Sequence, residues 1–405
     1  MGGEKLRFQT LFFVHFVAFS GFVVFRNVYL EEMGMSGSAM GAIGFLLTAT
    51  GVVAQPVWGV VSDYFRAERP VLAVGAAVSA LGLLAYPAAD GLATPFLLVA
   101  AGTAVYSAFH APIVPITNGL VLSRGYDYGN IRALGSIAFG IGSLGFGFLV
   151  ASLGISSIVY FYVLGMAVLV AVVWTLSEST DDGSDGPDGT ADAEELPMST
   201  AVRELVTNVD FLAVLLVAFL IGMSVRGGSA FFSVYVRAVD AAAVVGPWTL
   251  SPDAVTGAAW SLRTVFEAVA FVYAVRLSLS YKWLLLAGGL GVTLPNLVYG
   301  LTGSPAVIFA VQVAGGLGYG LYYLAAVNLV HGVASDRVTS TAQTALTGVG
   351  LGFGGAVGQV VAGELYDLVG VQRMYVYVAV IGFVGAAAAL LVRRTGSPVE
   401  RGPPR

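Results

Sequence analysis

Four ionisable residues lie deep inside long apolar stretches of this sequence: His110, Arg226, Arg263 and Glu267. An ionisable side chain at the centre of a membrane span costs about 2.5–3.5 kcal/mol on insertion scales, so it normally faces other protein groups or a wet cavity. Trp260, Arg263 and Glu267 are spaced at i, i+3 and i+7, which places them on one face of a helix. We therefore expect a polar face that can bind a solute, a proton or both.

Glu267 is the only carboxyl group at this depth, and Arg263 lies one helical turn before it. Burial and a nearby cation act in opposite directions on the protonation of a carboxyl group, so such a pair can exchange a proton as its surroundings change. The alternative is a static ion pair that braces the helix. We hypothesise that Glu267 binds substrate, a proton or both, with sodium as the alternative coupling ion.

Arg226 and Arg263 outnumber Glu267, so a cavity lined by them is net positive when His110 is neutral. This charge favours a substrate with a carboxylate or phosphate, which guanidinium groups bind bidentately. An uncharged sugar stays open, because Glu, Arg and Trp also suit hydroxyl groups and sugar rings. His110 is either a coupling residue or a hydrogen-bonded helix residue.

Two further polar stripes follow helical spacing. Tyr106 and His110 share one face with Thr103 and Thr117, and the other stripe contains His15, Phe19, Phe22 and Arg26. Four segments thus offer an inward polar stripe, as a central cavity between two bundles requires.

These residues need membrane-spanning helices to position them. The chain is 57% hydrophobic and only 11% charged, and its apolar runs of about 20 residues match the thickness of a bilayer core. Such runs must be helical because a lipid-exposed backbone satisfies its own hydrogen bonds. We predict an all-α membrane protein with spans at residues 7–30, 39–61, 71–89, 95–122, 131–152, 156–177, 210–237, 253–276, 283–301, 305–332, 341–365 and 371–392.

An acidic, Gly- and Ser-containing segment without basic residues separates spans six and seven. Such a segment cannot bury apolar surface. We therefore predict an N-terminal six-helix bundle (1–178), a cytoplasmic linker (179–200) and a C-terminal six-helix bundle (201–405). Nearly all Lys and Arg residues between spans fall on the side of the termini, which places both termini in the cytoplasm of a cell membrane.

Composition also argues against several classes of protein function. The chain has no cysteine, and neither of its two lysines, Lys5 and Lys282, lies in a phosphate-binding loop motif. The three histidines show no metal-ligand spacing. We expect no cofactor, no metal and no nucleic-acid partner, and a monomer in the lipid bilayer rather than an enzyme. The acidic loops and the excess of Arg over Lys resemble proteins of salt-loving archaea, with a GC-rich genome as the alternative cause of the Arg excess.

Residues 55–63 (QPVWGVVSD), with Gly59 and Asp63, resemble the end of helix two in the major facilitator superfamily. More narrowly, the chain resembles the branch of lactose permease, nucleoside–proton symporters and phenylpropionate permeases. Residues 128–132 (YGNIR), 231–235 (FFSVY), 341–343 (TAQ) and 363–367 (GELYD) carry that resemblance. It covers nearly the whole chain and implies two pseudo-symmetric six-helix bundles that transport solutes by alternating access.

The resemblance also implies residue roles. Asp63 would gate the cytoplasmic side by capping the start of helix eleven, with a solvated loop charge as the alternative. Arg132 falls where this branch has a substrate-binding arginine, or else it only sets topology. Glu267 falls where lactose-permease-like proteins have a substrate and coupling glutamate.

The sequence departs from the family pattern at four positions. Tyr64 replaces a usual basic residue, and Arg66 replaces a usual glycine in the gating loop. Asn118 replaces an acidic residue, and Gly315 lies near the position of a histidine that several proton symporters carry. The last two departures put the familiar proton-coupling network in doubt.

Together these features predict a secondary transporter that imports a small organic solute with protons. Efflux by proton antiport is an alternative, although helix five lacks the Gly-Pro pair of many exporters. A non-transporting sensor or scaffold of the same fold is the other alternative. It is disfavoured because a scaffold has no need to hold charges in lipid.

Overall fold

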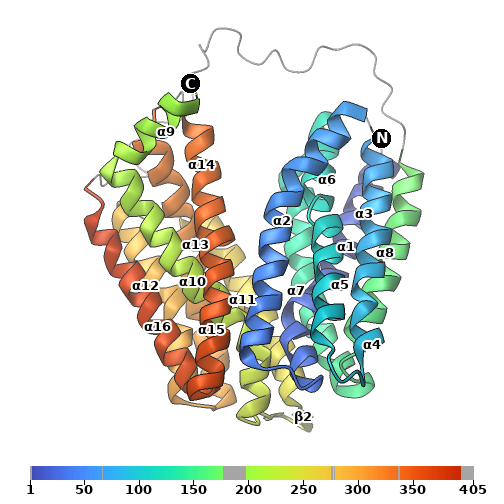
Figure 1. The fold of residues 1–405 in the computed structure, drawn as a ribbon. Helices are drawn as coiled ribbons and strands as arrows, with labels where there is room; N and C mark the ends of the chain where they lie inside the picture. Colours follow the sequence, from blue (N-terminus) through green and yellow to red (C-terminus); the bar gives the residue numbers. More distant parts are fainter. Residues whose placement is uncertain are drawn as a thin grey trace.

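The computed structural model describes residues 2–65, 67–176, 198–274, 277, 279–335 and 338–393. Within these residues, twelve helical segments are long and apolar enough to cross a membrane, which confirms the predicted number of spans. They form two bundles, here called the N-lobe and the C-lobe (Figure 1). Residues 179–197 of the predicted linker lie outside the described residues.

The N-lobe supplies the first six spans. Its helices are α1 (Gly2–Glu32), α2 (Gly37–Phe65), α3 (Glu68–Leu83), α4 (Ala85–Ala89), α5 (Phe96–His110), α6 (Ile113–Ser123), α7 (Tyr128–Leu153) and α8 (Ser157–Thr175). The fourth span, Phe96–Ser123, is broken into α5 and α6 at Ala111 and Pro112. Proline lacks a backbone N–H and its ring clashes with the preceding turn, so a break here is expected.

The C-lobe supplies the other six spans. Its helices are α9 (Met198–Thr207), α10 (Val209–Ala238), α11 (Pro252–Tyr273), α12 (Tyr281–Leu301), α13 (Pro305–Val333), α14 (Thr339–Thr347), η2 (Gly348–Gly354), α15 (Gly355–Val369), α16 (Val371–Ala388) and η3 (Ala389–Leu391). A two-stranded hairpin, β1 (Ala243–Val245) and β2 (Trp248–Leu250), joins α10 to α11 with Val244 opposite Thr249. The glycine-rich η2 is a π-helical turn within the eleventh span, a feature that is frequent at functional sites.

The two lobes meet at one side of the molecule and diverge toward the other (Figure 1). Since the number of spans is even, α1 begins and η3 ends at the same side, here called the terminus side. The lobes diverge toward this terminus side and meet at the opposite side. Buried apolar residues follow the same division. One cluster includes Phe25 of the N-lobe and Tyr375 of the C-lobe, whereas a second, with Leu284 and Val392, lies in the C-lobe alone.

Glycines allow the two inter-lobe seams to close. A Cβ on Gly147 of α7 would lie 2.7 Å from the carbonyl oxygen of Asp253 in α11, and one on Gly41 of α2 would lie 2.6 Å from that of Gln359 in α15. Real Cβ atoms do not come this close, so α7 packs on α11 and α2 on α15 with their backbones in contact. The glycine-rich fifth and eleventh spans thus pack at inter-lobe contacts.

Candidate functional site

The C-lobe presents its charged residues on adjacent helices. Arg263 and Glu267 are partly buried on α11, and Arg226 lies on α10 with an exposed side chain. Gly315 and Gly316 make room for them on α13. A Cβ on Gly316 would lie 2.3 Å from the carbonyl oxygen of Arg263, and one on Gly315 would lie 3.6 Å from its Nη1. Gly315, which lies near the position of a histidine in the resembled branch, therefore borders the Arg263 guanidinium.

Glu267 is the electrostatic centre of this group. Its carboxyl group interacts with the charges of Arg263 and Arg226 from its own lobe and of Arg132 from α7 of the other lobe. Among the described residues, however, Glu267 has no basic nitrogen within the 4.0 Å of an ion pair. The static Arg263–Glu267 brace is therefore absent from this conformation, and the guanidinium groups near Glu267 have donors that a solute can use.

Aromatic rings connect the charged group with the N-lobe. The guanidinium carbon of Arg263 lies 5.5 Å from the centre of the Trp260 ring. Trp260 in turn contacts Phe139 of α7 edge-to-face at 6.2 Å and Phe232 of α10 at 6.4 Å. The indole nitrogen of Trp260 is buried and has no hydrogen-bond partner among the described residues. A buried donor without a partner costs free energy, and Trp260 places one beside a cation and aromatic faces.

The candidate site residues of the N-lobe centre on two stacked histidines, whereas those of the C-lobe are arginines and a glutamate. His110 of α5 stacks on His15 of α1 with ring centres 4.9 Å apart, and on Tyr106 at the same distance. The Nδ1 atom of His110 lies 2.9 Å from the hydroxyl of Tyr162, which lies 2.9 Å from the hydroxyl of Ser79. His110 is the last residue before the helix break at Pro112. Coupling or a structural role for His110 both fit this arrangement, so the choice stays open.

The side chains of Tyr106 and Arg26 are buried, whereas their positions on polar helix faces predicted that they line a cavity. Tyr106 is buried beside Phe22, with ring centres 4.8 Å apart. Arg26 is buried between the lobes, where its guanidinium donates to Asn27 in α1 and to the side-chain oxygen of Gln359 in α15, each at 3.0 Å. In this conformation, neither side chain is open to a solute, and their substrate roles stay predictions.

Arg132 lies at the start of α7, beside α1. Its guanidinium stacks over the ring of Phe16 at 4.9 Å and reaches the hydroxyl of Ser136 at 3.5 Å. Its charge interacts with that of Glu267 on α11 of the other lobe. Three predicted charged positions on three helices, Arg132, Arg226 and Arg263, thus all act on the charge of Glu267.

A cavity of about 680 Å³ opens between α13 and α14 on the terminus side. It is lined by Tyr323, Val327, Asn328, His331, Thr339, Gln343, Thr344 and Thr347. The ring of Tyr323 stacks at 6.1 Å on that of Tyr319, which interacts electrostatically with Glu267. The volume of the cavity falls within the usual range for small-molecule sites.

The polar residues that line this cavity, here called its polar wall, were not predicted from the sequence. The tyrosines at 319 and 323 and His331 recur at multiples of four residues along the tenth span, which is the signal that reveals one helix face. Gln343 was recognised only as part of a family motif. Its side-chain nitrogen donates to the carbonyl oxygen of Val327 at 2.8 Å, which leaves its side-chain oxygen as an acceptor.

The predicted gate is only partly described. Asp63 and Gly59 lie on α2, and the side chain of Asp63 and the whole of Arg66 lie outside the described residues. A Cβ on Gly59 would meet nothing within 4 Å. The open space at Gly59 agrees with the separation of the lobes on the terminus side, and the gating roles of these three residues stay predictions.

Comparison with known proteins decides the family. The model of the MFS_1-like family matches residues 5–377. The chain belongs to the MFS_1-like family. Maltose permease of Geobacillus stearothermophilus is 26% identical over 408 residues, covering 96% of this chain and 95% of the permease. The uncharacterized transporter YwbF of Bacillus subtilis (strain 168) is 24% identical over 397 residues, covering 94% of each chain.

Solved structures share the same fold. A point mutant of the nucleoside transporter NupG has a TM-score of 0.81 at 17% identity and covers 96% of this chain and 100% of its own. A bacterial homolog of the human lysosomal transporter Spinster, crystallised inward-facing and unoccupied, has a TM-score of 0.72 at 14% identity, covering 100% of this chain and 99% of its own. This member of the MFS_1-like family is therefore a multi-pass membrane transporter and not an enzyme.

Proposed function

We propose that this transporter imports a small hydroxylated organic solute together with protons, by alternating access between its two lobes. The observation that carries the proposal is the position of Glu267, among three arginines of both lobes yet in no ion pair within the described residues. A carboxyl group so placed can change its protonation or its partner when a solute binds. The Lys and Arg bias places the terminus side in the cytoplasm.

A hydroxylated solute is supported by the uncharged polar wall of the cavity. Asn328 donates its side-chain nitrogen to the carbonyl oxygen of Leu324, and Thr344 and Thr347 donate their hydroxyls to the preceding helical turn. The hydroxyl hydrogens of Thr344 and Thr347 and one of the two amide hydrogens of Asn328 are therefore used within the helix, which leaves their oxygens as acceptors at the cavity wall. Sugars and nucleosides supply many hydroxyl donors, and the names of maltose permease and of NupG agree with that class.

An organic anion is the second candidate, and Arg226 favours it. The exposed Arg226 side chain lies against Gly355, where a Cβ would come within 2.7 Å of its Cγ. Its charge acts on those of Arg26 and Glu267. A net positive site of this kind can bind a carboxylate or phosphate.

The test is flux into proteoliposomes under an imposed pH gradient. A thermal-shift screen of sugars, nucleosides and aromatic acids against purified protein first selects the solute. We expect Glu267→Gln to reduce proton-driven accumulation by at least about tenfold, since neutral Gln cannot exchange a proton. Glu68→Gln, which changes a carboxyl group at the start of α3, is the matched control and should transport normally.

Four results would each overturn a part of this proposal. Full proton-driven uptake with unchanged affinity in Glu267→Gln would remove Glu267 from both binding and coupling. Unchanged uptake in Arg226→Gln would remove the argument for an anion and leave the neutral solute. Solute flux that runs outward with inward proton flow would instead identify an exporter, and solute binding without any flux would identify a sensor.

A further inference from the structure

The first turn of α2 is completed by a residue of the other lobe. The backbone N–H groups of Gly37 and Ser38 donate to the two carboxylate oxygens of Asp367, at 2.6 and 2.8 Å, and the Ser38 hydroxyl donates to the same carboxylate at 2.6 Å. The next two N–H groups are satisfied locally by Ser36, through its hydroxyl and its carbonyl oxygen. A helix start leaves four such groups without partners. Here Asp367 of the C-lobe satisfies two of them.

The position of Asp367 on its own helix is otherwise unfavourable. Asp367 lies in the last turn of α15, which ends at Val369, before Gly370 with its positive φ of 80°. A carboxylate is disfavoured at a helix C-terminus, where the helix dipole is negative, and favoured at an N-terminus. The carboxylate of Asp367 therefore stabilises α2 rather than α15.

Close packing holds the two helix ends in register. A Cβ on Gly37 would lie 2.4 Å from the carbonyl oxygen of Gly363, and a Cβ on Gly363 would lie 2.2 Å from that of Gly37. The backbones of α2 and α15 are in contact at this point, so the cap forms only when the two lobes touch.

The end of α1 repeats the pattern with two more carboxylates. Glu31 accepts a hydrogen bond from the Tyr366 hydroxyl of α15 at 2.8 Å, and Glu32 pairs with Arg237 of α10 at 2.5 Å. Arg237 also binds Asp253 of its own lobe at 2.7 Å. Asp253 moves with Arg237. Of the two ion pairs of Arg237, therefore, only the pair with Glu32 must break when the lobes separate.

We infer that Asp367 is a latch residue, which stabilises the state closed at the side opposite the termini by capping α2 from the other lobe. Opening that side removes the cap and leaves two N–H groups of α2 without this partner. Asp367 thereby sets the balance between the two states of the cycle. The inference rests on the alternating-access part of the proposed function, and it needs neither a particular solute nor a particular ion.

Accessibility of single cysteines tests the latch, because the chain has no native cysteine. Thr344→Cys reports on the terminus side, where Thr344 lines the cavity. Thr48→Cys reports on the inter-lobe contact, where Thr48 accepts a hydrogen bond from Gln359 at 3.1 Å. The full-length protein in proteoliposomes is labelled with a maleimide in each background, without added solute.

Asp367→Ala should slow labelling at position 344 and speed it at position 48, with a change of about fivefold in the ratio of the two rates, the size expected for loss of a helix cap. Asp367→Asn keeps one acceptor and should give a smaller change in the same direction. Glu364→Ala is the matched control, since Glu364 lies three residues earlier on α15, is exposed and makes no hydrogen bond among the described residues.

Three outcomes would overturn the latch. They are unchanged labelling at both positions in Asp367→Ala, an equal shift in Glu364→Ala, and faster labelling at both positions, which is the sign of a fold defect. Because no solute is used, each of these results leaves the transport proposal standing. Failure of the flux experiments would in turn leave the labelling result valid.

Discussion

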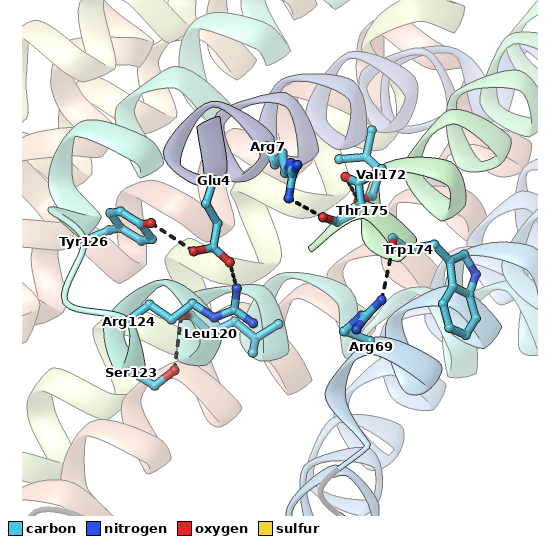
Figure 2. A network of polar contacts seen from close by, with 10 residues as sticks. All are labelled: Glu4, Arg7, Arg69, Leu120, Ser123, Arg124, Tyr126, Val172, Trp174 and Thr175. Carbon is cyan, nitrogen blue, oxygen red and sulfur yellow. Dashed lines mark hydrogen bonds and ion pairs between the residues drawn. The ribbon is translucent and has the colours of Figure 1, made fainter. Parts of the chain in front are cut away.

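The two sides of the molecule use charged side chains at helix ends in opposite ways. On the terminus side, Arg7 and Arg69 donate to the carbonyl oxygens of Thr175 and Trp174 at the end of α8, and Arg124 pairs with Glu4 (Figure 2). These contacts join helices of one lobe. On the opposite side, Asp367, Glu31 and Glu32 lie at helix C-termini and bind groups of the other lobe.

The difference separates two kinds of stabilisation. Arg7 and Arg69 place their charges at the C-terminus of α8, where a cation is favourable, and α8 belongs to the same lobe as their own helices. The Arg7, Arg69 and Arg124 contacts therefore hold the N-lobe together in every state of the cycle. A carboxylate at a helix C-terminus is unfavourable until the other lobe provides its partner, so contacts of Asp367 and Glu32 stabilise one state only. Substitutions on the two sides should accordingly change different measured quantities.

The largest effect on transport is expected where a glycine lets the backbones of the two lobes come into contact. A Cβ on Gly257 of α11 would lie 2.3 Å from the carbonyl oxygen of Ser143 in α7, so Gly257→Leu cannot fit in this conformation. We expect transport to fall by at least about tenfold, since an overpacked contact forces the helices apart. Maleimide labelling at Thr344→Cys should also slow, because the closed side is held open.

Gly145→Leu is the control for this prediction. A Cβ on Gly145, in the same α7, would meet nothing within 4 Å, so a larger side chain there has space. Normal transport in Gly257→Leu, or an equal loss in Gly145→Leu, would show that close contact at this seam does not control the state.

An intermediate effect is expected at the predicted gate of the terminus side. If Asp63 caps the start of the eleventh span in the opposite state, Asp63→Asn should slow turnover about two- to fivefold, the range expected for loss of a charge near a helix N-terminus. Solute affinity should stay unchanged. Turnover is measured in proteoliposomes and affinity by binding to purified protein, and weaker binding with normal turnover would exclude the gate.

The sequence predicted what depends on local spacing and on lipid. Twelve spans follow from hydropathy because a bilayer core admits only long apolar helices. The shared face of Trp260, Arg263 and Glu267 follows from helical periodicity, and in the structure Arg263 stacks over Trp260, whose ring contacts Phe139 of the other lobe. The sequence alone therefore predicts which side chains of this helix can contact one another.

Partners distant in sequence could not be predicted in this way. Asp367 caps Gly37 across 330 positions, and His15 stacks on His110 from another helix. Helical periodicity predicts which residues share a face of a helix, but it does not predict how far each side chain is buried. Arg26 shows the limit, since its stripe predicted a wet cavity, whereas the structure buries its guanidinium against Gln359.

The smallest effect is expected within the N-lobe on the terminus side. Glu4 pairs with Arg124 and accepts a hydrogen bond from the Tyr126 hydroxyl at 3.1 Å (Figure 2). Glu4→Gln should lower the stability of the folded protein by about 1 kcal/mol, a typical value for a partly exposed charged hydrogen bond. The loss is measured as a lower thermal midpoint in detergent. Glu204→Gln, on α9 of the C-lobe, is the matched control and should leave the midpoint unchanged. Labelling at positions 48 and 344 should keep its parental ratio in Glu4→Gln, because both partners of Glu4 move with it. A shift of that ratio would mean that this network senses the state of the cycle, and the distinction between the two sides would fail.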